Sequence, residues 1–180
     1  ENFDASRDMN TIYHEIAHAW NVKNLDPQPC RFESEGYARF LEFLLLEKID
    51  GKEHAVSEEA DNYLRRIRSA FTGHEAYQHI PIRDYGAKGM TNYSYSLGMV
   101  VFAIFYDLVG EEQFNRIIGS FYAQYHETGA TLDEFISHCV ESAGPRFERF
   151  FNDWIYTTGG IQLVMEGLSL PELIRFYQEM

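Results

Sequence analysis

Five consecutive residues, His14-Glu15-Ile16-Ala17-His18, combine residue types and a spacing that suit metal chemistry. On an α-helix, positions i and i+4 lie on the same face, so His14 and His18 can offer imidazole nitrogens to one ion. A shift of one residue would turn one histidine by about 100° around the helix axis. Glu15 lies beside the first histidine and can accept a proton from a metal-activated water. The pattern predicts zinc bound on a helix, with hydrolysis as its chemistry.

A third metal ligand is expected from the segment Glu33-Ser34-Glu35-Gly36-Tyr37. Catalytic zinc usually takes three protein ligands and leaves a fourth position for water. Both Glu33 and Glu35 are suitable, and spacing alone does not choose between them. Gly36 would let the backbone come close to the metal. Glu42 lies two helical turns beyond Glu35 on the same face, so we expect it to accept a hydrogen bond from the free N–H of a ligand histidine.

The elements that must position these residues are predicted to be helices almost throughout. The first helix has hydrophobic residues at spacings of three and four, which predict a packed amphipathic helix that Asp4 or Ser6 would cap. That stripe consists of Met9, Ile12, Tyr13, Ile16 and Trp20. Further helices are expected over about 34–49, 57–72, 93–108, 111–126, 131–142 and 145–154, with a last short one from Pro171.

Three segments depart from this regular pattern. Residues 74–92 contain scattered glycines and a proline and predict a long irregular loop. Thr131 and Glu134 have the spacing of a capping box, which predicts a helix start there. Gly159-Gly160 is expected to stop the preceding helix, and 161–166 is the best strand candidate. We therefore expect a helical lobe over 1–160 and a C-terminal extension over 161–180.

Composition and charge exclude several classes of protein. The 180 residues suffice for one domain with a sizeable core. There are 28 acidic and 15 basic residues, a net charge of −13 that disfavours nucleic acid and anionic membrane surfaces. No apolar run approaches the roughly 18–20 residues of a membrane-spanning helix. Two cysteines are too few for a disulfide scaffold. We expect a soluble chain; no signal peptide is visible and no compartment is indicated.

Four short segments resemble motifs of the gluzincin metallopeptidases. His14 to Trp20 is similar to the zinc helix of the aminopeptidase N family, and Trp20-Asn21-Val22-Lys23 resembles the glycyl aminopeptidase family. In both families the third ligand lies in a Glu-Gly-aromatic segment, which Glu35-Gly36-Tyr37 matches. The resemblance thus implies zinc on His14, His18 and Glu35. Tyr95-Ser96-Leu97-Gly98 is similar to the Tyr-x-x-Gly of the aminopeptidase N family, which implies that Tyr95 steadies the oxyanion.

The resemblance also implies a fold and an activity. The fold is mainly α, the helical lobe of a thermolysin-like (gluzincin) peptidase, with the zinc site between two adjacent helices. A β-rich lobe that forms the other wall of the cleft is expected to lie outside this chain. The implied activity is an aminopeptidase-like zinc metallopeptidase acting on peptides or proteins, and whether this lobe acts alone stays open. The alternative is an inactive or non-peptidase zinc-binding homologue that serves as a helical binding module.

Overall fold

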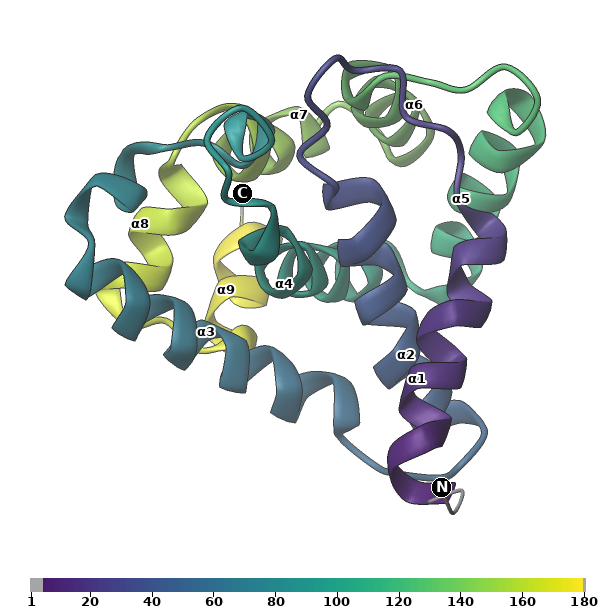
Figure 1. The fold of residues 1–180 in the computed structure, drawn as a ribbon, viewed down its shortest axis with the longest axis horizontal. Helices are drawn as coiled ribbons and strands as arrows, with labels where there is room; N and C mark the ends of the chain where they lie inside the picture. Colours follow the sequence, from purple (N-terminus) through teal and green to yellow (C-terminus); the bar gives the residue numbers. More distant parts are fainter. Residues whose placement is uncertain (1–4, 180) are drawn as a thin grey trace.

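The computed structural model describes residues 5–179, which form helices joined by loops (Figure 1). The α-helices are α1 (Ala5–Ala17), α2 (Tyr37–Lys48), α3 (Ala55–Gly73), α4 (Thr91–Val109), α5 (Glu111–Tyr125), α6 (Leu132–Ala143), α7 (Phe147–Phe151), α8 (Gly159–Glu166) and α9 (Leu170–Gln178). Within the described range there is no strand, only an isolated parallel bridge between Asn24 and Ala130. The prediction of a mainly α lobe is confirmed.

In residues 5–179, five short 3₁₀- or π-helical segments complete the element order. They are η1 (His18–Trp20), η2 (Phe32–Gly36), η3 (Glu75–His79), η4 (Ile82–Asp84) and η5 (Asn152–Tyr156). The segments η2 and η5 are π-helices; η2 continues directly into α2, and η5 follows directly after α7. The loop predicted over 74–92 is irregular over 74–90 apart from η3 and η4, and its last two residues already belong to α4.

The helix α4 is the centre of the core. Every residue from Leu97 to Phe105 is buried, so this helix is apolar on all sides, as expected of a helix enclosed by others. The segment η2 and the helices α2, α3, α5 and α9 pack against it, and Figure 1 shows α4 in the middle of the fold. Phenylalanines fill much of the space around it; the ring of Phe102, for example, stacks on Phe32 with centroids 4.9 Å apart. This core fixes the positions of η2, α2 and α4, three of the elements near the predicted site.

The helix α1 lies at the edge of the fold and packs mainly on α2. Over residues 9–17 of this helix, the buried side chains are Tyr13 and Ala17. The expectation that the whole apolar stripe is packed is wrong, because Ile16 is 53% exposed and Trp20 is 50% exposed. The helix α2 lies beside one flank of the stripe, so it covers only the side chains of α1 on that flank. Asp4, one predicted cap, lies outside the described residues, and Ser6 lies within the helix rather than before it.

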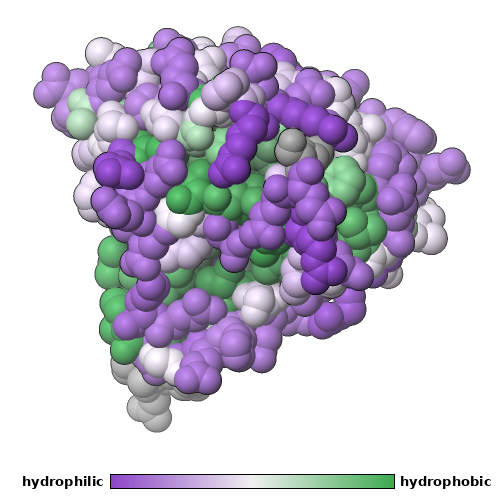
Figure 2. Space-filling view, turned by 180° about the vertical axis from the view of Figure 1, so that it is seen from behind, coloured by the Kyte–Doolittle hydropathy of each residue, from purple (hydrophilic) through white to green (hydrophobic). Residues whose placement is uncertain are grey.

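Hydrophobic side chains also reach the surface elsewhere. The large exposed ones are Ile12, Ile16, Trp20, Leu25 and Ile49. Figure 2 shows hydrophobic surface in the middle of the opposite face and along the edge nearest the grey N-terminal residues. In the described range no single helix is long and apolar enough to cross a membrane; α4 and α5, bent by 119°, meet that test only as a pair.

The C-terminal prediction of a strand over 161–166 is wrong, since these residues belong to α8. A short apolar run does not distinguish a strand from a buried helix by periodicity. Gly160 does not stop a helix either; a Cβ there would stand 2.4 Å from the Trp154 ring, so the glycine permits a close helix contact. The predicted capping box of Thr131 and Glu134 is confirmed at the start of α6. The division at residue 160 stays a prediction.

Candidate metal centre

The two histidines lie where α1 tightens into η1. His14 is in the last turn of α1 and His18 is the first residue of η1. Their rings lie edge to face with centroids 4.8 Å apart. Burial of Tyr13 and Ala17 against α2 turns this flank of α1, and with it His14, toward η2. Partial burial, followed by the neighbouring His18, lowers the pKa of His14 and favours the neutral imidazole that binds metals.

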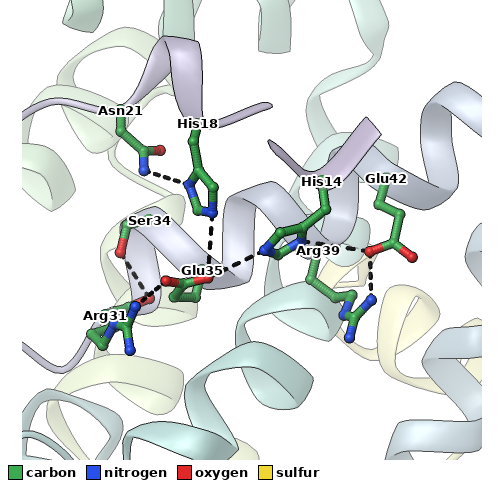
Figure 3. A network of polar contacts seen from close by, with 8 residues as sticks. All are labelled: His14, His18, Asn21, Arg31, Ser34, Glu35, Arg39 and Glu42. Carbon is green, nitrogen blue, oxygen red and sulfur yellow. Dashed lines mark hydrogen bonds and ion pairs between the residues drawn. The ribbon is translucent and has the colours of Figure 1, made fainter. Parts of the chain in front are cut away.

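Glu35 of η2 points its carboxylate between the two rings (Figure 3). Its Oε2 lies 3.3 Å from His14 Nε2 and 3.5 Å from His18 Nε2. The three donor atoms all lie within 4.8 Å of one another. Donors about 2 Å from a shared tetrahedral centre stand about 3.3 Å apart, so the spacing suits one ion of the size of zinc. Two imidazoles and one carboxylate form a donor set typical of catalytic zinc.

The competing carboxylate, Glu33, points elsewhere. Its Oε1 accepts a hydrogen bond from the Asn24 side chain, and its Oε2 is buried without a partner. Burial raises the pKa of Glu33 to about 7. Positions 33 and 35 face opposite sides of the segment, so only Glu35 reaches the histidines.

Gly36 has a different role from the one that we expected. A Cβ on Gly36 would stand 2.7 Å from the Cα of Gly98 in α4. The missing side chain therefore lets η2 touch the backbone of α4, rather than the metal. This contact brings Tyr95, one turn before Gly98, to the side of Glu35.

Further side chains lie behind the histidine rings (Figure 3), although Nδ1 of His14 itself is buried without a hydrogen bond. Glu42, only 2% exposed, places Oε2 3.5 Å from Nδ1 of His14 and accepts a hydrogen bond from Arg39. The side-chain nitrogen of Asn21 lies 2.7 Å from Nδ1 of His18, and the Asn21 Oδ1 is buried without a partner. Turning this amide by 180° would let Oδ1 accept a hydrogen bond from Nδ1–H, and Nε2 would then keep the lone pair that a metal needs.

The two predicted catalytic groups flank the cluster. Glu15 is exposed on α1, next to His14. Tyr95 lies near the start of α4, its ring parallel to that of His14 with centroids 6.2 Å apart. Partial burial, followed by the charge of Glu35, raises the pKa of Tyr95, so its hydroxyl keeps its proton. The nearby Tyr85 is fully buried and Tyr93 packs on Phe71, away from the cluster.

Sequence reasoning missed three residues at this centre, namely Asn21, Arg31 and Arg39. Arg31 donates to Oε1 of Glu35, and its guanidinium lies 5.6 Å from the centroid of the Tyr95 ring. Each arginine precedes its glutamate by three or four residues, a spacing that pairs side chains on one helix. That spacing was the available signal, although it does not by itself indicate a site.

Comparison with known proteins agrees with this geometry. No curated protein sequence matches the chain. The sequence model of the peptidase family M1 domain matches residues 2–154, which include both histidines, Glu15, Glu35 and Tyr95. The match covers most of the chain and all of the elements that build the cluster. On this evidence, the chain belongs to peptidase family M1.

Proposed function

We propose that this chain is a zinc-dependent metallopeptidase that hydrolyses peptide bonds in an aminopeptidase-like manner. The observation that carries the proposal is the convergence of His14, His18 and Glu35, with donor atoms within 4.8 Å of one another. Membership of peptidase family M1 supports the same class of reaction. The β-rich lobe expected from the resemblance would supply the other wall of the cleft, and a peptide or protein would be the substrate.

Each residue around the cluster has a role in this proposal. Zinc on the three ligands would supply a Lewis acid that lowers the pKa of water and polarises a carbonyl. Glu15, exposed beside His14, would accept the proton of the attacking water and deliver it to the leaving amine. The Tyr95 hydroxyl would donate a hydrogen bond to the oxygen of the scissile carbonyl as its negative charge grows. Glu42 and Asn21 would orient the two rings.

The test is zinc analysis and peptide hydrolysis on the purified chain, with peptides whose amino ends are free or acetylated. We expect one zinc per chain and cleavage of the free peptides only. Glu15→Gln should keep the zinc and slow turnover by about 10²-fold or more, because it removes the proton acceptor and no ligand. Unchanged turnover would remove Glu15 from the mechanism. Zinc binding without any hydrolysis, both by this chain and by a longer protein that includes the β-rich lobe, would favour the alternative, a zinc-binding module without peptidase activity.

A further inference from the structure

We propose that Arg31 is a positioning residue of the metal centre, which keeps one oxygen of Glu35 away from the ion and holds the Tyr95 ring beside it. The inference rests on the proposed function. It adds a residue that lies outside the His14–His18 motif and outside the Glu35-Gly36-Tyr37 segment.

The first step is the division of the two oxygens of Glu35. Arg31 Nη2 donates to Oε1, whereas Oε2 faces the two histidines (Figure 3). A free carboxylate can turn and offer a metal both oxygens. With Oε1 occupied by a charged hydrogen bond, Glu35 supplies a single donor, and the coordination position for water stays open. Hydrogen bonds of this kind also fix the ligand side chain in advance, so it loses less conformational entropy when the metal binds.

The second step is the contact between Arg31 and Tyr95. The guanidinium carbon lies 5.6 Å from the centroid of the tyrosine ring, within the range of a cation–π interaction. The same ring lies parallel to that of His14. Arg31 therefore contacts both a metal ligand and the proposed oxyanion donor, and it sets their relative position.

The backbone of Arg31 makes a clean test possible. Its φ of 66° and ψ of 15° lie in the left-handed region, where a residue with a side chain is disfavoured by about 1–2 kcal/mol. Glycine adopts this conformation without that cost. Arg31→Gly therefore removes the guanidinium while it suits the turn before η2, and a defect in this variant does not come from backbone strain.

Arg83 offers a matched control elsewhere in the fold. Its guanidinium lies 4.8 Å from the ring centroid of Tyr156, and it pairs with Asp133 at 3.7 Å. The exposed fractions of the two arginine side chains are similar, 42% for Arg83 and 46% for Arg31. Arg83→Ala thus removes the same kinds of contact without touching the cluster.

The experiment measures zinc affinity by competition with a chelator, and the visible absorption of the Co²⁺-substituted chain, which reports ligand geometry. We expect Arg31→Gly to bind zinc about 10–100-fold more weakly and to change the Co²⁺ spectrum. Arg31→Lys should lose less, because it keeps the charge but not the planar fork. Arg83→Ala should leave both readouts unchanged.

Two results overturn the inference alone. One is Arg31→Gly with unaltered affinity and spectrum while the unmodified chain binds zinc, which leaves the proposed function intact. The other is an equal loss in Arg83→Ala, which assigns the effect to general destabilisation. Absence of zinc from the unmodified chain instead contradicts the proposed function, and the inference falls with it.

Discussion

At the scale of single residues, the feature that distinguishes this centre is the way its buried carboxylates are compensated. Glu35 is 6% exposed and Glu42 is 2% exposed. A buried carboxylate without partners is costly, by several kcal/mol in proteins. Each has an arginine three or four residues before it as a hydrogen-bond donor, and each faces a histidine nitrogen. The chain thus compensates both buried carboxylates with its own side chains.

Tyr95 provides the prediction at this scale. Tyr95→Phe removes one hydroxyl and keeps the ring that packs beside His14 and Arg31. If the hydroxyl stabilises the oxyanion, kcat should fall by about 10²–10³-fold, whereas zinc content and KM should change little. Steady-state kinetics on peptides and metal analysis check this expectation.

Tyr93→Phe is the control, because this tyrosine packs on Phe71 and Tyr77, away from the cluster. Equal activity of the Tyr95→Phe variant and the unmodified chain would show that the hydroxyl takes no part in the reaction.

At the scale of elements, the site depends on the crossing of η2 and α4. The two segments touch at Gly36 and Gly98, each of which would place a Cβ within 2.7 Å of the other's backbone. Glu35 directly precedes one of these glycines, and Tyr95 lies one turn before the other. The segment η2 is a π-helical turn, which is wider than an α-helical turn and directs Glu35 toward α1. Such turns are frequent at functional sites.

Gly98→Ala tests this crossing. The added methyl group would stand 2.6 Å from the Cα of Gly36, so we expect a loss of about 1–3 kcal/mol in the free energy of unfolding. Because η2 and α4 must separate, activity should fall as well. Denaturant unfolding and peptide hydrolysis measure the two effects.

The matched control is Gly119→Ala in α5, where a Cβ would meet nothing within 4 Å. Alanine is the better helix former there and should stabilise the chain by about 0.5–1 kcal/mol. A Gly98→Ala variant as stable as Gly119→Ala would contradict the close crossing.

At the scale of the whole molecule, the centre joins an edge helix to the core. The segment η2 and the helices α2, α3, α5 and α9 pack around α4, whereas α1 lies outside and rests mainly on α2. Two of the three candidate ligands come from α1 and η1, and the third comes from η2, which packs on α4. A metal ion bound by all three would tie the edge helix to the core.

Zinc should therefore raise the thermal stability of the chain. At a free concentration about 100-fold above its Kd, a ligand that binds only the folded state adds about 2.7 kcal/mol. For a chain of this size, that corresponds to a rise of several degrees in Tm. Thermal unfolding with zinc and with a chelator measures the rise.

His14→Ala should abolish the effect of zinc on Tm, and His79→Ala, on an exposed position of η3, should preserve it. An unchanged zinc effect in His14→Ala would mean that the ion binds somewhere else.

Local sequence patterns determined much of the secondary structure of this protein and part of its candidate metal centre. The spacing of His14 and His18 predicted a shared helix face, the periodicity predicted the helices that surround α4, and Thr131 with Glu134 predicted the start of α6. These features depend on residues within one or two turns of each other, so the sequence alone contains them.

Only the tertiary structure decided the rest. Spacing left Glu33 and Glu35 open and only the family resemblance favoured Glu35; the physical reason is tertiary, because the direction of η2 over α4 brings Glu35 alone to the histidines. The exposed flank of α1 and the helix at 161–166 were predicted wrongly, because neighbours distant in the sequence decide which face is buried. Arg31 gains its place through a left-handed turn and a contact with α4. Local sequence determines which residues share a face of a helix, but packing against distant segments determines which face is buried.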